Sequence, residues 1–260
     1  MPDVESHLHG TPSWCDKSTA DLDATKAFYG ALFGWEFHTA PEEEAGGYTM
    51  ALLNGRAAAA VMPLSDEQLG QGMPPVWSMY ITVDDVDAMP AKVEAAGGTV
   101  MAPPFDVLTA GRMMVAFDTG GAGICFWEAR DNIGSEIVNE TGAFTWAELY
   151  TGDPAADTAF YAETLGHDVT TADMGGPVEM TFLKRGDADV ATVLPLMAEG
   201  MPPHWVPYFG VDDCESAMAQ ITAMGGEVHV GPIDIPPGRF AVAADPEGAT
   251  FAVIRLNPMD

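Results

Sequence analysis

The chain has 260 residues, 39 of them acidic and 10 basic, so its formal net charge is −29 at pH 7. This charge repels nucleic-acid phosphates and anionic membrane surfaces, so neither is an expected partner. Hydrophobic residues make up 47 % of the chain, but no apolar run approaches the roughly 18 residues of a membrane span. The first residues lack the basic start and apolar centre of a secretory signal. We therefore expect a globular protein with no membrane segment.

The acidic excess favours solubility, including at high salt, over a cation-collecting surface, because no clustered acidic motif accompanies it. The three cysteines, Cys15, Cys125 and Cys214, are odd in number and do not occupy equivalent places in the two halves of the chain. A disulfide framework is therefore not expected, and a reducing cytoplasm fits the cysteine usage.

The first 62 residues predict one β-α-β-β-β module. A short strand over residues 11–19 leads into a helix over 22–33, which begins after an N-cap at Asp21 and stops at Gly34. Asn54-Gly55 is a hairpin turn signal. The remaining predicted strands are 36–39, 48–53 and 57–62.

The same order of elements follows a polar connector. A strand over 77–83 precedes a helix that begins at Asp84-Asp85 and ends at Gly97-Gly98, with Pro90 in its first turns. The strands predicted after this helix are 99–102, 113–117 and 124–128. The first half of the chain is therefore expected to contain two modules in series.

The second half repeats the first. MPPVWSMYITVDD at residues 73–85 returns as MPPHWVPYFGVDD at 201–213, with eight of thirteen positions identical. Unrelated windows share roughly one such position. Residues 129–142 form the only plausible linker, so we expect domains over 1–135 and 136–260 and four modules in an α+β fold.

Several repeated motifs extend over nearly the whole chain. They are AFYGALFGW and AFYAETLG after the first strand of each half, VDDVDA…AAGG and VDDCESA…AMGG around the next helix, and DPEGATFAVI near the end. These motifs resemble the vicinal oxygen chelate superfamily, which includes glyoxalase I, the bleomycin-resistance proteins and the extradiol dioxygenases. WAELYTGDP and PPHWVPYFGVDD are most similar to the two-domain actinobacterial members called glyoxalase-like or hydroxylase-like. The resemblance implies two domains in which paired βαβββ modules curl mixed sheets into cups.

In this superfamily the floor of a cup often holds a divalent metal bound by His and Glu. The equivalent positions here carry residues that are poor metal ligands or a single thiol: Trp14, Ser78 and Cys125 in the first half, and Trp146, Val206 and Ala252 in the second. Glu179 matches a fourth ligand position, but a single carboxylate does not retain a metal. The resemblance therefore predicts no metal centre and no other cofactor.

Strand alternation predicts which side chains face each cup. They are Trp14, Asp16, Ser78, Tyr80, Cys125 and Trp127 in the first half, and Trp146, Glu148, Tyr150, His204, Val206 and Tyr208 in the second. An aromatic cup with a few polar groups suits an apolar or aromatic small molecule. The alternative for any one tryptophan is packing within the sheet.

Glu148 and His204 are the candidate catalytic residues. Burial beside tryptophan raises the pKa of a carboxylate, so Glu148, like Asp16 in the first half, is suited to act as a general acid or base. The alternative is a carboxylate held by backbone donors. His204 is the one histidine placed on a repeated strand, where the first half has Val76.

Two arginines occupy equivalent places, and both are candidate ligand clamps. Arg112 and Arg239 could bind a carboxylate or phenolate, but in an acidic protein an ion pair is slightly favoured. Cys125 could act as a nucleophile only with a base nearby, and otherwise is a small buried apolar residue.

The leading hypothesis is a metal-free protein that binds a hydrophobic or aromatic metabolite, sequestering it or acting on it by acid–base chemistry. The alternatives are a glyoxalase-like lyase or a hydroxylase or dioxygenase-type enzyme, and a pure interaction protein whose cups are filled by side chains. We expect a monomer, in which the two halves form an internal pseudo-dimer, or a weak homodimer.

Overall fold

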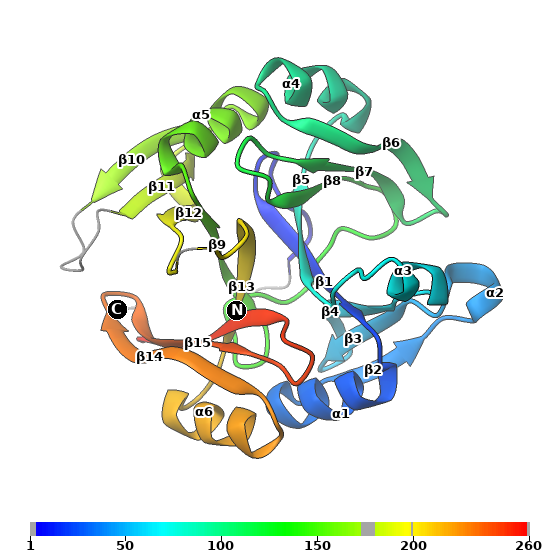
Figure 1. Cartoon of the computed structure of the whole chain (residues 1–260), viewed down its shortest axis with the longest axis vertical. Helices are drawn as coiled ribbons and strands as arrows, with labels where there is room; N and C mark the ends of the chain where they lie inside the picture. Colours follow the sequence, from blue (N-terminus) through cyan, green and yellow to red (C-terminus); the bar gives the residue numbers. More distant parts are fainter. Residues whose placement is uncertain (1–3, 173–179, 199, 259–260) are drawn as a thin grey trace.

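The computed structural model describes residues 4–172, 180–198 and 200–258 (Figure 1). In the first unit the helices are α1 (Leu22–Phe33), α2 (Glu42–Ala45), α3 (Asp66–Gly70) and α4 (Met89–Ala95), with a 3-10 turn, η1, over Val86–Ala88. Its strands are β1 (Pro12–Thr19), β2 (Glu36–Thr39), β3 (Thr49–Leu53), β4 (Arg56–Pro63), β5 (Trp77–Thr82), β6 (Thr99–Val107), β7 (Gly111–Phe117) and β8 (Gly123–Ala129).

The second unit repeats this pattern with two long helices, α5 (Pro154–Leu165) and α6 (Cys214–Ala223). Its strands are β9 (Phe144–Thr151), β10 (Asp168–Ala172), β11 (Met180–Arg185), β12 (Ala188–Pro195), β13 (His204–Gly210), β14 (Glu227–Ile235), β15 (Gly238–Ala244) and β16 (Thr250–Leu256). No described helix is long and apolar enough to cross a membrane.

Each unit forms one mixed sheet of eight strands. The strand orders are β2-β3-β4-β1-β5-β8-β7-β6 and β10-β11-β12-β9-β13-β16-β15-β14. In the first sheet β1 runs parallel to β4 and antiparallel to β5, and β9 is paired in the same two ways with β12 and β13. The α+β fold of four βαβββ modules is confirmed, and each cup is built from two modules of the same unit.

Three of the departures from the sequence prediction have clear local causes. The strand expected to end at residue 102 continues as β6 through Pro103 and Pro104, which is possible because β6 lies at the sheet edge and carries register shifts. The helix expected from Asp85 is divided into η1 and α4, and Pro90 falls at the start of α4. The polar connector contains α3, which is capped by reciprocal hydrogen bonds between Ser65 and Gln68.

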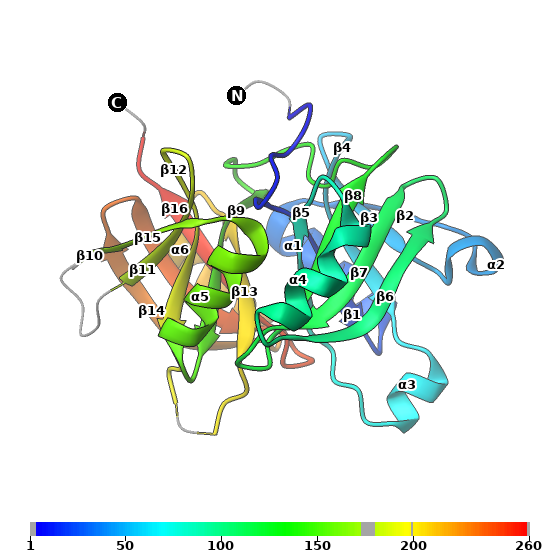
Figure 2. The ribbon, with the colours of Figure 1, turned by 90° about the horizontal axis from the view of Figure 1, so that it is seen from above.

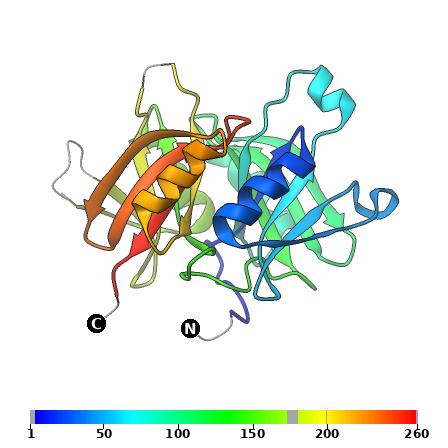
Figure 3. The ribbon, with the colours of Figure 1, turned by 90° about the horizontal axis from the view of Figure 1, so that it is seen from below.

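The two units pack through the sheet faces that lie opposite the cups. Figures 2 and 3, which view the molecule from opposite sides, show α4 and α5 at one edge of the junction and α1 and α6 at the other. The buried core is continuous across the junction. Phe209 of the second unit lies with its ring centroid 4.9 Å from that of Phe33 and 5.2 Å from that of Trp77 of the first.

The tyrosine of each AFY motif crosses this junction. Tyr29 donates from its hydroxyl to Asp245 at 2.9 Å and accepts a bond from the Trp77 indole at 3.0 Å. Tyr161 makes the equivalent pair, donating to Asp118 at 2.9 Å and accepting from Trp205 at 3.1 Å. Both tyrosines are completely buried. The repeated motif therefore fixes each unit to the end of a strand in the other.

The charges beside these two links differ. Lys17 is completely buried and pairs with Asp245 at 3.2 Å and with Glu247. The equivalent of Lys17 in the second unit is Leu149, and two carboxylates, Asp118 and Asp157, are buried near each other there. Burial, and next the charge of Asp157, raises the pKa of Asp118 to about 6. The pseudo-symmetric junction thus has one charge-compensated end and one acidic end.

Removing one crossing hydroxyl should destabilise the protein. Tyr161→Phe leaves the buried Trp205 N–H without its acceptor and Asp118 without one donor, which should lower the free energy of unfolding by about 1–3 kcal/mol. Thr158→Val on the same helix is the matched control, because the Thr158 hydroxyl is buried with no hydrogen-bond partner among the described residues. Urea unfolding of both variants provides the measurement. Equal loss of stability in the two variants would contradict this account.

Candidate functional site

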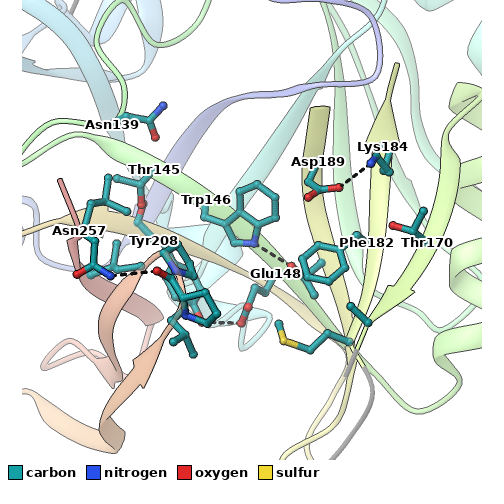
Figure 4. Close-up of a pocket in the computed structure, with 18 of the residues that line it drawn as sticks. Asn139, Thr145, Trp146, Glu148, Thr170, Phe182, Lys184, Asp189, Tyr208 and Asn257 are labelled. Carbon is teal, nitrogen blue, oxygen red and sulfur yellow. Dashed lines mark hydrogen bonds and ion pairs between the residues drawn. The ribbon is translucent and has the colours of Figure 1, made fainter. Parts of the chain in front are cut away.

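A cavity of about 800 Å³ occupies the cup of the second unit. Figure 4 shows Trp146, Glu148 and Tyr208 gathered in it, with Lys184 and Asp189 on one side and Asn257 on the other. Trp146 and Glu148 lie two residues apart on β9, so they share the cup face, and Tyr208 is the cross-strand neighbour of Trp146 on β13. The cup is open, so it is not filled by side chains as an interaction protein would require.

Glu148 is the acidic centre of this cavity and is only 6 % exposed. Its Oε2 accepts hydrogen bonds from the hydroxyls of Tyr150 at 2.8 Å and Tyr208 at 2.5 Å. Burial raises the pKa of Glu148, and the hydrogen bonds from Tyr208 and Tyr150 oppose that rise. Both tyrosines donate to the same oxygen. No described hydrogen bond reaches the other oxygen, Oε1.

The neighbours of Glu148 are held by further contacts. The Trp146 indole donates to the Thr192 hydroxyl at 2.9 Å, which fixes the plane of the ring in the cavity. His204 stacks on Tyr150 with ring centroids 5.7 Å apart, and its Nδ1 lies 2.9 Å from the Pro202 carbonyl oxygen. Burial lowers the pKa of His204. His204 therefore contacts the Glu148 network through Tyr150 and is not among the described residues that line the cavity.

The first unit has a smaller cavity of about 560 Å³ with the same plan. Asp16 is 6 % exposed, and its Oδ2 accepts from Tyr80 at 2.7 Å and from Tyr48 at 3.2 Å. Trp14 donates to the Tyr48 hydroxyl at 3.0 Å. Burial raises the pKa of Asp16 to about 6, opposed by hydrogen bonds from Tyr80, Tyr48 and Ser78. A buried carboxylate held by two tyrosines is thus common to both cups.

Cys125 and Trp127 complete the first cup on β8. Cys125 is paired in register with Tyr80, and burial followed by the charge of Asp16 raises the pKa of its thiol far above neutral pH. A thiolate nucleophile is therefore disfavoured at this position. Trp127 lines the cavity and donates to the Asn132 carbonyl at 2.9 Å.

The two arginines lie outside both cavities. Arg112 pairs with Asp87 at 2.8 Å and Asp106 at 3.1 Å. Arg239 makes the equivalent pairs with Glu215 at 2.8 Å and with Asp234 at 2.6 Å. Their positions correspond to the ion-pair alternative. Each arginine forms salt bridges that connect its own hairpin, β6–β7 or β14–β15, to the neighbouring helical segment, η1 or α6.

The sequence prediction did not include two residues that shape the cups. Tyr48 precedes β3 and reaches Asp16, and Thr192 on β12 orients Trp146. Extending strand alternation through residues 48, 50 and 52 would have identified Tyr48, because Met50 also lines the first cavity. Glu179, considered as a fourth metal ligand, lies outside the described residues.

Comparison with known proteins identifies the family. The sequence model described as the Glyoxalase/Bleomycin resistance protein/Dioxygenase superfamily matches residues 12–126 and 143–253. The chain belongs to this superfamily. CFP32 of Mycobacterium bovis, which is named as a glyoxylase, is 44 % identical over 260 residues and covers 99 % of each chain. The anthracycline biosynthesis protein DnrV of Streptomyces peucetius is 36 % identical over 259 residues, covering 95 % of this chain and 94 % of DnrV.

Two solved structures share the fold. The Mn(II)-bound glyoxalase from Novosphingobium aromaticivorans superimposes with a TM-score of 0.65 at 19 % identity, covering 97 % of this chain and 84 % of that one. The 2,3-dioxygenase LapB from Pseudomonas sp. KL28 gives a TM-score of 0.65 at 15 % identity, covering 97 % and 94 %. At these identities the likeness concerns the fold alone.

The donor atoms in the cups do not fit a metal centre of the kind this superfamily uses. Each cup has one buried carboxylate, and the groups bonded to it are tyrosine hydroxyls that donate to it. The second carboxylate in each lining, Asp106 or Asp189, is exposed and paired with a basic side chain. Within residues 4–172, 180–198 and 200–258, no three His, Cys, Asp or Glu side chains are grouped so that they could hold a metal ion. Val206 and Ala252 are buried apolar residues in the floor of the second cup.

The raised pKa of Asp16 should make stability depend on pH. Burial makes the ionised form of Asp16 less favourable in the folded state than in the unfolded state. The contribution of Asp16 to the free energy of unfolding therefore falls as pH rises from 3.8 through about 6. Asp16→Asn keeps an oxygen for the two tyrosines and avoids the penalty. We expect it to gain up to about 3 kcal/mol relative to the wild type at pH 7.5, and little below pH 4.

Asp187→Asn, in the exposed turn between β11 and β12, loses one negative charge without any change in a cup. Denaturant unfolding of both variants at the two pH values separates the effect of removing a buried carboxylate from the effect of changing the net charge. A gain for Asp16→Asn that is independent of pH, or that is matched by Asp187→Asn, would count against a buried, ionisable Asp16.

Proposed function

We propose that this protein binds an aromatic small molecule in the cup of its second unit, without a metal, and that Glu148 recognises a hydrogen-bonding group on the ligand. The observation that carries the proposal is a buried carboxylate, held through one oxygen by Tyr150 and Tyr208, at a cavity of about 800 Å³ lined by Trp146. Three buried, unpaired cysteines are consistent with action in a reducing cytoplasm.

The cavity is large enough for a drug-sized ligand. Trp146, Phe182 and Tyr208 offer aromatic faces or edges in its lining, and each well-placed aromatic contact adds about 0.5–1.5 kcal/mol beyond burial of area. The name of the relative DnrV, an anthracycline biosynthesis protein, supports a ligand with fused aromatic rings.

The protonation state of Glu148 determines which ligand group it recognises. When ionised it accepts a hydrogen bond from a ligand hydroxyl, and when protonated it donates one to a ligand carbonyl. Because burial raises its pKa, both states are more accessible near neutral pH than for an exposed glutamate. The same property would let Glu148 act as a general acid or base if a bound ligand presents a transferable proton. His204 would then act only through Tyr150, as a positioning residue.

A glyoxalase-like lyase is the second candidate, and it is favoured by the name of CFP32 at 44 % identity. Glyoxalase I chemistry needs a metal that polarises the substrate oxygen. One buried carboxylate in each cup does not supply such a site, and no three potential metal ligands are grouped among the described residues. Sequestration or metal-free acid–base chemistry therefore agrees better with the residues present.

Substituting Glu148 should weaken ligand binding selectively. With 1,4-dihydroxyanthraquinone as the probe, Glu148→Gln should raise the dissociation constant about tenfold, which corresponds to about 1.4 kcal/mol. Asp16→Asn is the matched control, because it makes the same chemical change in the other cup and should leave the constant unchanged. Quenching of tryptophan fluorescence measures both. Failure of the wild type to bind, or equal effects of the two substitutions, would contradict the proposal.

Binding should not depend on a metal. Protein dialysed against a chelator should keep its affinity for the same probe and its melting temperature, and elemental analysis should find divalent metal well below stoichiometric amounts. A stoichiometric metal that is required for binding, or robust turnover of a hemithioacetal restored by Mn(II), would favour the lyase instead.

A further inference from the structure

The mouth of the first cup is apolar although it faces water. Three of its lining residues are large apolar side chains with high exposure: Met62 at 37 %, Phe105 at 43 % and Leu108 at 66 %. Among the described residues of the lining, Asp106 is the one exposed charged residue, and it is paired with both Arg112 and Arg130. Exposed apolar side chains clustered around a cavity mark a surface suited to apolar contacts.

Leu108 occupies this position because of a local backbone feature. Three residues separate β6 from β7, whereas two residues, Pro236 and Pro237, separate β14 from β15 in the second unit. Leu108 has φ of +48°, in the left-handed region that bulky side chains rarely adopt. The longer turn therefore holds a strained and exposed leucine at the entrance to the first cavity, an arrangement that suggests a functional role.

The mouth of the second cup is different. The exposed residues that line it are mainly polar or proline: Asn139, Thr170, Asp189, Asn257, Pro236, Pro237 and Pro258. Lys184 also lines this cavity and pairs with Asp189 at 3.5 Å. These side chains offer both hydrogen-bond donors and acceptors above an aromatic floor.

We propose that the two cups select different classes of ligand: the first takes a compact, mainly apolar aromatic molecule, and the second takes a larger aromatic molecule with a hydroxyl-rich periphery. This inference rests on the proposed function, that the cups bind small molecules. The cavity volumes of about 560 and 800 Å³ agree with this division. An apolar ligand would cover Phe105 and Leu108, and a hydroxylated one would replace water at Asn257 and Thr170.

Two uncharged probes separate the classes. N-phenyl-1-naphthylamine is compact and apolar, and 2-naphthyl β-D-glucopyranoside joins a naphthalene ring to a hydroxylated sugar. Ala45 and Ala172 are partly buried small residues that line the first and second cavities respectively. Ala45→Trp should weaken binding of the naphthylamine by about tenfold or more and leave the glucoside unchanged, because an inserted indole fills only the first cavity. Ala172→Trp should have the opposite selectivity.

Two milder variants keep the test valid if a tryptophan variant fails to fold. Leu108→Asn places a residue that tolerates positive φ at the mouth of the first cup, and should weaken the naphthylamine at least about threefold by removing apolar contact. Thr170→Val should weaken binding of the glucoside and leave binding of the naphthylamine unchanged. Equilibrium dialysis of all variants with both probes gives the dissociation constants.

The outcomes distinguish the two levels of the proposal. If both probes bind the wild type but the same variants weaken both, the cups bind ligands without dividing them by class, and only the present inference fails. If neither probe binds but 1,4-dihydroxyanthraquinone does, only the present inference fails. If 1,4-dihydroxyanthraquinone also fails to bind, the proposed function fails with it. If only the naphthylamine fails to bind and sedimentation experiments find dimers, a second copy of the chain covers the apolar mouth. That result would overturn the inference.

Discussion

The hydrogen bonds that Tyr29 and Tyr161 make across the junction determine the arrangement of the whole molecule. Each tyrosine lies on the first helix of one unit and donates to an aspartate that follows the third strand of the other unit's second module. Each hydroxyl also accepts from a buried tryptophan of its own unit, so separating the units would break the two tyrosine–aspartate bonds and leave the tryptophan bonds in place. The sheet faces opposite the cups are therefore packed against each other. The opposite faces, which carry Asp16 and Glu148, remain available to form open cups.

Alternation along β1 connects the junction to the site. Trp14 and Asp16 face the cup, while Cys15 and Lys17 face the junction. A buried lysine requires opposite charge, and Asp245 and Glu247 provide it from the second unit. In the second unit Leu149 replaces the lysine, so Asp118 and Asp157 share their end of the junction without such a cation and burial raises the pKa of Asp118 to about 6. The two copies have therefore diverged at the junction as well as in their cups.

The sequence predicted the features that depend on local pattern and missed those that depend on distant contacts. The duplication predicted four modules, and Asp21 and Gly34 predicted both ends of α1. Two-residue alternation predicted that Asp16 and Tyr80 share one cup face and that Glu148 and Tyr208 share the other, and each pair is joined by a hydrogen bond. It could not show that Tyr48, which precedes β3, reaches Asp16, or that Arg112 is held by Asp87, since both contacts depend on tertiary packing. The crossing from Tyr29 to Asp245, 216 positions apart, has no signal in local sequence.

The tyrosine–carboxylate arrangement has a consequence for any ligand that enters the second cup. Two hydroxyl donors offset only part of the cost of burying the charge of Glu148, which is why its pKa stays raised despite them. Under the proposed function, a ligand hydroxyl that donates to Oε1 supplies a third donor and lowers that pKa, so binding releases a proton. A ligand carbonyl favours the protonated acid instead, and its binding takes up a proton. Recognition is thus coupled to protonation, and the sign of that coupling reports which group of the ligand meets Glu148.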